Sequence, residues 1–145
     1  MNKSLVILDA NIFITFLSKE PNYQRALALW QSFVESEARI VAPLLLRYEV
    51  TSVLYRKARG KLLDKIFAQE ALSIFNAMDI SWHDNIDLTQ RAYELAIFFN
   101  HPNTYDAHYL ALAEMHNCPF WTGDARLFNA IHEQFPLIRW VGNAP

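Results

Sequence analysis

Four acidic residues occupy positions where a folded chain could use them together: Asp9, Glu49, Asp106 and Asp124. Asp9 and Asp124 each follow a short apolar run, and Glu49 and Asp106 lie in the first turns of predicted helices. Clustered carboxylates repel one another unless a cation neutralises them, and oxygen ligands without cysteine or paired histidine favour Mg²⁺ or Mn²⁺. Such a site suits phosphoryl chemistry, because a bound divalent ion lowers the pKa of water and screens charge on a phosphodiester.

Each acid also has an ordinary structural explanation. Asp is a favoured N-cap residue, and Asp9 taken alone fits that role better than a catalytic one. Asp106 and Asp124 would suit the N-terminal ends of helices, where the dipole stabilises negative charge. Glu49 would be a solvated helix acid, although its sequence neighbours are apolar and an unpaired charge among them would be costly. Convergence of the four acids in space is what would favour a shared site.

Strands and helices alternate along the chain, which predicts how the acids are positioned. Apolar runs and helical periodicity predict strands at 5–8, 40–42, 78–82, 118–121 and 137–141, and helices at 12–17, 23–37, 44–58, 61–77, 87–100, 105–116 and 125–132. Thr104 is the expected N-cap of helix 105–116. We expect an α/β fold, a single-domain α/β/α sandwich over residues 1–145 with a mostly parallel sheet of about five strands and 5–8 as the central strand. Right-handed crossovers would then bring the acids to one edge of the sheet.

The composition narrows the class of protein. The chain has 145 residues, 52% of them hydrophobic, so it can bury a core, and its formal charge of -2 gives no overall attraction to nucleic acid. The single cysteine, Cys118, is expected to be a buried small hydrophobe, and with no signal-like start it favours a reducing, cytoplasmic setting. No apolar run approaches the roughly 18 residues of a membrane span. Only three glycines are present, and they form no glycine-rich phosphate loop.

Four short motifs resemble, in order and separation, those of the PIN domain family. They are Asp9-Ala10-Asn11 after an apolar strand, Arg47-Tyr48-Glu49-Val50, Tyr105-Asp106-Ala107-His108-Tyr109-Leu110-Ala111-Leu112-Ala113, and Thr122-Gly123-Asp124 after another apolar strand. The match spans nearly the whole chain, and each motif falls at a predicted strand or helix end. In size and build the chain is similar to the VapC-type toxins of bacterial toxin–antitoxin pairs.

The resemblance implies a Mg²⁺- or Mn²⁺-dependent endoribonuclease whose products carry 5′-phosphate and 3′-hydroxyl ends. The implied catalytic acids are Asp9, Glu49, Asp106 and Asp124. Of these, Asp9, Asp106 and Asp124 would hold the metal, and Asn11 and Thr122 would be polar supports. No histidine is assigned to the site. A toxin of this kind also implies a small antitoxin protein that fills the acidic groove, for example by placing an Arg against the carboxylates.

Two alternatives belong to other classes. The first is a catalytically silent PIN-like module that binds RNA or protein, which the presence of all four acids disfavours. The second is another Mg²⁺-dependent phosphohydrolase, such as a haloacid dehalogenase-like phosphatase. That chemistry needs a second acid two residues after the nucleophilic Asp, where this chain has Asn11.

Two surface features bear on partners. Residues 47–65 carry six of the 13 basic residues: Arg47, Arg56, Lys57, Arg59, Lys61 and Lys65. Arg47, Arg56, Lys57 and Arg59 are candidate RNA contacts, and a solvated helix junction or a protein-binding surface explains the segment equally well. Tyr23, Trp30 and Phe33 would serve a homodimer, the antitoxin or the core, and the sequence does not decide among these.

Overall fold

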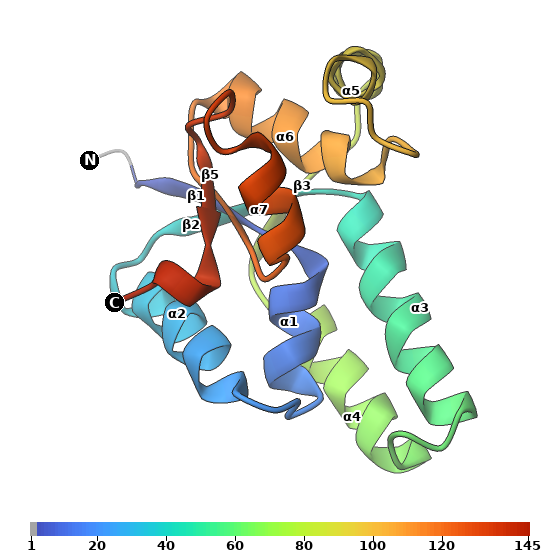
Figure 1. Cartoon of the computed structure of the whole chain (residues 1–145). Coiled ribbons are helices and arrows are strands. Elements are labelled where there is room, and N and C mark those ends of the chain that lie inside the picture. Colours follow the sequence, from blue (N-terminus) through green and yellow to red (C-terminus); the bar gives the residue numbers. More distant parts are fainter. Residues whose placement is uncertain (1–2) are drawn as a thin grey trace.

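A parallel five-stranded sheet forms the centre of the fold (Figure 1). The structure, a computed structural model, describes residues 3–145. The strands are β1 (Leu5–Leu8), β2 (Arg39–Pro43), β3 (Ile80–His83), β4 (Phe120–Thr122) and β5 (Ile138–Trp140), in the spatial order β3-β2-β1-β4-β5. Every neighbouring pair is parallel, so all the strands end at the same edge. The predicted fold class and the central position of β1 are confirmed.

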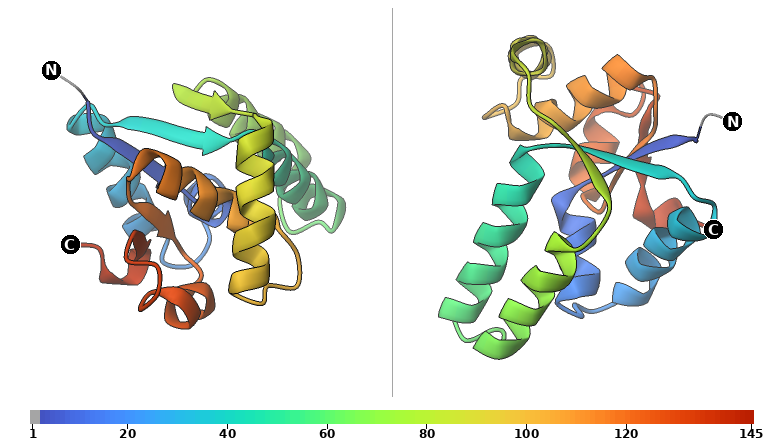
Figure 2. Two further views of the ribbon diagram at one scale, coloured as in Figure 1. Left: turned by 90° about the horizontal axis from the view of Figure 1, so that it is seen from above. Right: turned by 180° about the vertical axis from the view of Figure 1, so that it is seen from behind.

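Helices cover both faces of this sheet. They are α1 (Ala10–Leu17), α2 (Tyr23–Glu35), α3 (Leu45–Arg59), α4 (Lys65–Asn76), α5 (Ile86–Phe98), α6 (Tyr105–His116) and α7 (Ala125–Ile131), followed by a short 3₁₀ helix, η1 (Val141–Asn143). Helices α1–α4 lie on one side of the strands and α5 and α6 on the other (Figure 1). Figure 2 shows α3 and α4 side by side as a helical hairpin. Within residues 3–145, no helix is long and apolar enough to cross a membrane.

The start of α4 and the capping of α6 differ in detail from the prediction. Helix α4 begins at Lys65 rather than residue 61, because Asp64 Oδ2 accepts hydrogen bonds from the backbone N–H groups of Ile66 (3.0 Å) and Phe67 (3.2 Å). Thr104 occupies the N-cap position of α6 as predicted, but its side chain makes no capping hydrogen bond. A side-chain bond at this start comes instead from Asn103, whose Oδ1 accepts from the backbone N–H of Tyr105 at 3.1 Å.

The aromatic residues of α2 belong to the core. Trp30 packs against Phe13 and Phe16 of α1, with ring centroids 5.7 Å and 5.9 Å apart, and Phe33 lies beside Trp121 of β4 at 6.4 Å. Tyr23 is also packed against the buried cluster. These three α2 residues, each partly buried, therefore contribute to the packing of the core. Cys118 is buried as expected, and burial raises the pKa of its thiol to about 11.

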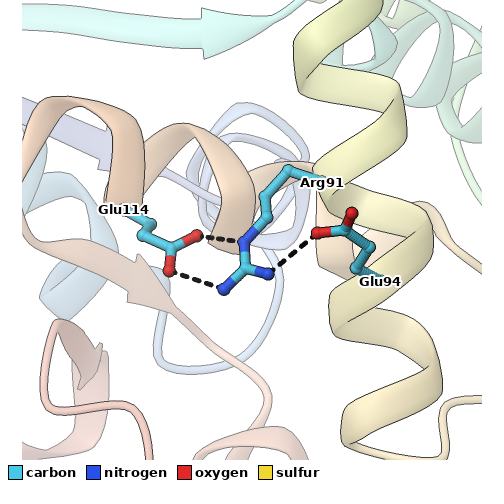
Figure 3. Close-up of polar contacts among 3 residues, drawn as sticks. All are labelled: Arg91, Glu94 and Glu114. Atoms are coloured by element: carbon cyan, nitrogen blue, oxygen red, sulfur yellow. Dashed lines mark hydrogen bonds and ion pairs between the residues drawn. The ribbon is translucent and has the colours of Figure 1, made fainter.

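An ion-pair network joins α5 to α6, the helix that carries Asp106 (Figure 3). Arg91 of α5 forms a two-pronged contact with Glu114 of α6, Nε to Oε2 at 2.6 Å and Nη2 to Oε1 at 2.8 Å. Its Nη1 donates to Glu94 at 2.9 Å. Planar two-bond contacts of this type fix the relative orientation of the helices that carry them.

Candidate active site

Asp9 stands at the end of the central strand, but its side chain does not cap the helix that follows. The residue is in the N-cap position of α1 with extended backbone angles, and no capping hydrogen bond is formed. Its Oδ2 accepts instead from Thr122 Oγ1 at 2.8 Å and from Asn11 Nδ2 at 3.3 Å. Only 6% of Asp9 is exposed. The capping explanation that Asp9 favoured when taken alone is therefore wrong for its side chain.

The environment of Asp9 opposes its negative charge. Burial is the largest cause, and the Asp106 carboxylate is the next; together with Glu49 they raise the pKa of Asp9 to about 7, against hydrogen bonds that lower it. Within residues 3–145, no Lys or Arg forms an ion pair with Asp9 or with the other three predicted acids. A buried carboxylate without a cationic partner is costly, and here the neighbouring charges add to that cost.

Asn11 and Thr122 contact Asp9 through a connected set of hydrogen bonds. Thr122 is fully buried, and its hydroxyl donates to Asp9 while accepting from the backbone N–H of Asp124 at 3.0 Å. Asn11 Oδ1 accepts from the backbone N–H of Gly123 at 2.8 Å, and its Nδ2 faces Asp9. A Cβ atom at Gly123 would lie 3.0 Å from Asn11 Oδ1, so glycine allows this close approach.

Glu49 is positioned by a tyrosine that sequence reasoning did not single out. The hydroxyl of Tyr109 donates to Glu49 Oε1 at 2.6 Å, while its ring is fully buried and stacks on Phe120 of β4 at 5.3 Å. Burial raises the pKa of Glu49, as does the charge of Asp106, and the Tyr109 bond opposes the shift. The pKa of Tyr109 is held well above its usual value by burial and by the surrounding carboxylates. Its spacing of three residues from Asp106 was the available signal, since such residues share a helix face.

Asp106 and Asp124 complete the group from two further elements. Asp106 is half-buried in the first turn of α6, and its pKa is raised by burial and by the charge of Asp124. Asp124 is exposed and caps α7, with Oδ1 accepting from the backbone N–H groups of Arg126 (2.9 Å) and Leu127 (3.2 Å). For Asp124 the structural role is thus real, and it coexists with electrostatic coupling to Asp106.

Two histidines border the acids, although none was assigned to the site from sequence. The charge of His101 lowers the pKa of Asp106, and that of His108 lowers the pKa of Glu49. His108 Nδ1 lies 2.6 Å from the backbone carbonyl of Thr104, so this ring has a local partner. His101 packs against Phe99, and its buried Nδ1 has no hydrogen-bond partner among residues 3–145.

The four acids influence one another electrostatically, and their donor chemistry fits a hard divalent cation. The couplings run from Asp9 to Asp106 and Glu49, from Glu49 to Asp106, and from Asp106 to Asp124. All donors are carboxylate oxygens, the ligands that Mg²⁺ and Mn²⁺ prefer. Across residues 3–145, however, no three such side chains are drawn together closely enough to form a ready-made metal group.

The basic residues of α3 differ in how far they are engaged. The guanidinium of Arg47 lies over the Trp82 ring, 4.6 Å from its centroid, and Lys57 Nζ forms an ion pair with Glu20 at 2.6 Å. Arg56 and Arg59 are exposed and form no ion pair among the described residues. Of the four candidate RNA contacts, Lys57 is paired with an acid among the described residues, whereas the three arginines are exposed and are not.

Comparison with known protein families agrees with the parallel sheet and with the coupled acids at its carboxyl edge. The PIN domain family model matches residues 6–133, and the chain belongs to this family. It is 26% identical over 133 residues to the VapC ribonuclease Mb0985 of Mycobacterium bovis and, to the same extent, to the ribonuclease VapC9 of Mycobacterium tuberculosis. Each alignment covers 92% of this chain and 96% of the relative.

Solved structures share the fold. VapBC2 from Rickettsia felis, bound to a DNA fragment from its promoter, superposes with a TM-score of 0.66 at 15% identity, covering 94% of this chain and 96% of that one. A toxin–antitoxin complex from Klebsiella pneumoniae gives a TM-score of 0.60 at 20% identity, covering 92% and 95%. These similarities extend over almost the full length of both chains.

Proposed function

We propose that this protein is a Mg²⁺- or Mn²⁺-dependent endoribonuclease and the toxin of a toxin–antitoxin pair. The observation that carries the proposal is Asp9, a buried carboxylate whose pKa is raised to about 7 by burial and by the charges of Asp106 and Glu49, and which forms no ion pair with a Lys or Arg among residues 3–145. Membership of the PIN domain family and the ribonuclease names of two relatives support the same chemistry.

In the proposed mechanism three carboxylates bind the metal, and two polar side chains orient one of them. Asp9, Asp106 and Asp124 would hold the metal, which when bound lowers the pKa of a water and screens charge at the phosphate. Thr122 and Asn11 keep the Asp9 carboxylate in one orientation through their hydrogen bonds. Hydrolysis adds water to phosphorus and breaks the bond to the 3′ oxygen.

Glu49 is the group in this set with the properties of a general base. Tyr109 fixes its Oε1, and its raised pKa moves it toward the range in which a carboxylate accepts a proton efficiently. Glu49 would take a proton from the attacking water while Tyr109 holds the carboxylate in place. This role differs from that of Asp9, whose Oδ2 is already engaged by two donors.

A parallel substrate assay tests the function. Wild-type, Asp9→Asn and Asp79→Asn proteins receive single-stranded RNA, single-stranded DNA or a small phosphomonoester, with Mg²⁺, Mn²⁺ or EDTA. Asp79 is an exposed acid just before β3 and serves as the matched control. We expect metal-dependent RNA cleavage to 5′-phosphate ends, lost by more than about 100-fold in Asp9→Asn because partners of metal ligands alone are worth 10- to 100-fold. Cleavage of the phosphomonoester alone would identify another phosphohydrolase, and binding of RNA without cleavage would identify a silent module.

We also propose a small antitoxin partner and a homodimer. A groove of about 480 Å³ lies between α3 and α4, with Leu54, Ala58, Ala68 and Leu72 in its lining. Tyr55, which also lines the groove, is 63% exposed. Such a surface suits an amphipathic segment or a second copy. Light scattering of the purified chain gives its oligomeric state, and purification beside its co-expressed genomic neighbour tests the antitoxin.

A further inference from the structure

A second concave surface opens beside the candidate active site. A pocket of about 680 Å³ lies between α1, the start of α2 and the segment that follows β5. Its lining includes Thr15, Asn22, Gln24, Arg25, Gly123 and Trp140. Gly123 belongs to both places, since its N–H donates to Asn11, which in turn contacts Asp9. The pocket therefore adjoins the turn that precedes Asp124, although none of the four acids is in its lining, and its volume lies within the range of small-ligand sites.

One wall of this pocket is built by a specific set of contacts. Arg25 Nη1 donates to the backbone carbonyl of Gly142 at 2.6 Å, which ties α2 to η1. A Cβ atom at Gly142 would lie 2.3 Å from the Trp140 ring, so the indole lies directly against the glycine backbone. Because a guanidinium carries five N–H donors, the single bond of Arg25 leaves most of them available. The wall thus contains the Trp140 ring, which also stacks on Phe128 with centroids 6.4 Å apart, and the Arg25 guanidinium bonded to Gly142.

The composition of the pocket matches a nucleotide better than a peptide. Asn22 and Gln24 offer amide groups that donate and accept hydrogen bonds, which is how protein side chains read the edges of bases. An aromatic ring and a guanidinium are the groups that contact unstacked bases and phosphates of single-stranded RNA. The pocket also lies where β1, β4 and β5 end, at the edge where parallel sheets bind ligands.

We propose that this pocket binds one nucleotide of single-stranded RNA next to the scissile phosphate, with its base against Trp140 and the amides and its phosphate on Arg25. The proposal rests on the proposed ribonuclease function, because the substrate class comes from it. The four free mononucleotides AMP, CMP, GMP and UMP serve as probes, so the binding test does not depend on catalysis.

Fluorine NMR of protein labelled with 5-fluorotryptophan gives the readout. The chain has four tryptophans, and Trp140→Phe identifies the signal of Trp140. We expect at least one mononucleotide to shift that signal in a saturable way, while Trp82 on the far edge strand β3 stays unchanged and inorganic phosphate has no such effect. If inorganic phosphate shifts the Trp140 signal equally, the pocket binds anions without recognising a base, and the proposal is overturned. Absence of any mononucleotide shift would overturn it as well.

Two variants and a control locate the binding. Gly142→Ala keeps the indole but displaces it, and Arg25→Ala removes the cation from an exposed position, so each should weaken mononucleotide binding by roughly 5- to 100-fold. Arg39 is an exposed residue at the start of β2, so it lies at the amino ends of the strands, away from the pocket. The Arg39→Ala variant should bind mononucleotides as the wild type does. Unchanged affinity in both pocket variants would refute the assignment.

RNA cleavage separates this proposal from the proposed function. If the protein cleaves RNA, Arg25→Ala should raise KM with little change in kcat, whereas an unchanged KM would contradict the pocket and leave the ribonuclease function standing. If the protein binds mononucleotides at Trp140 and cleaves no RNA, the ribonuclease proposal fails and the nucleotide pocket stands.

Discussion

Replacing Asp9 by Asn should stabilise the metal-free protein in a pH-dependent way. The pKa of Asp9 is raised from 3.8 to about 7, mainly by burial and by Asp106. Between these pH values the folded protein retains a proton that the unfolded chain has released, so stability falls as pH rises through the window. At about 1.4 kcal/mol per pH unit, the carboxylate costs about 4 kcal/mol above pH 7. Asn has the same shape and carries no charge, so it avoids this cost.

Thermal unfolding in EDTA measures the effect. We expect wild-type and Asp9→Asn proteins to differ little near pH 4 and the variant to gain roughly 10 °C in Tm by pH 8, given the unfolding entropy of a chain of this size. Asp79→Asn, at an exposed acid, should follow the wild type throughout. Added Mg²⁺ should raise the Tm of wild type at pH 8 and have a smaller effect on Asp9→Asn, since a ligand stabilises only the state that binds it.

If the Tm difference between wild type and Asp9→Asn is the same at pH 4 and pH 8, then Asp9 does not stand in a buried environment that opposes its charge. The reasoning that assigns Asp9 to a shared acidic site would then fail, whatever the activity of the variant.

Three further substitutions probe the supports of the site and of α6. Tyr109→Phe removes the donor to Glu49 and should lower kcat by about 10-fold or more while the fold is kept, since hydrogen bonds to charged groups are worth roughly 1.5–3 kcal/mol; single-turnover cleavage checks this. Thr122→Val removes the hydroxyl that donates to Asp9 and should raise the pKa of that carboxyl further, seen as a wider pH window in the unfolding experiment, whereas Thr122→Ser should behave as wild type. Arg91→Ala breaks an exposed network and should cost about 1 kcal/mol, decreasing with added salt, as urea unfolding at low and high NaCl would show.

The order of elements and the sheet could be predicted because burial imposes periodicity on the sequence. The strands of a parallel sheet are buried on both faces and appear as short apolar runs, and each helix repeats its apolar residues at helical spacing. Helix ends were less predictable, because they depend on local bonds such as those of Asp64 and Asn103. Whether Trp30 faces solvent or the core depends on how α2 packs on α1, which the periodicity of α2 alone does not contain.

The acids of the site were accessible from sequence because they follow strands or open helices, where parallel topology brings residues together. Their partners were not. Tyr109 of α6 bonds to Glu49 of α3 although the two helices lie on opposite sides of the strands, and the two residues are 60 positions apart. Likewise Arg25 meets Gly142 across 117 positions, so the nucleotide pocket has no local sequence signature. Side chains that support a site through long-range contacts need the folded structure to be identified.

Asp9 and Asp124 occupy equivalent positions, each directly before a helix, and their difference bears on the function. Asp124 uses its carboxylate as an N-cap, a role worth about 1 kcal/mol. Asp9 forgoes that bond, turns toward Thr122 and Asn11, and incurs a cost of about 4 kcal/mol at neutral pH when no cation is present. Carboxylates whose pKa is strongly raised by burial and neighbouring charge cluster at functional sites. A divalent cation shared with Asp106 would neutralise the Asp9 carboxylate and remove this free-energy cost. Metal binding therefore explains why the Asp9 side chain adopts an orientation that is unfavourable for folding alone.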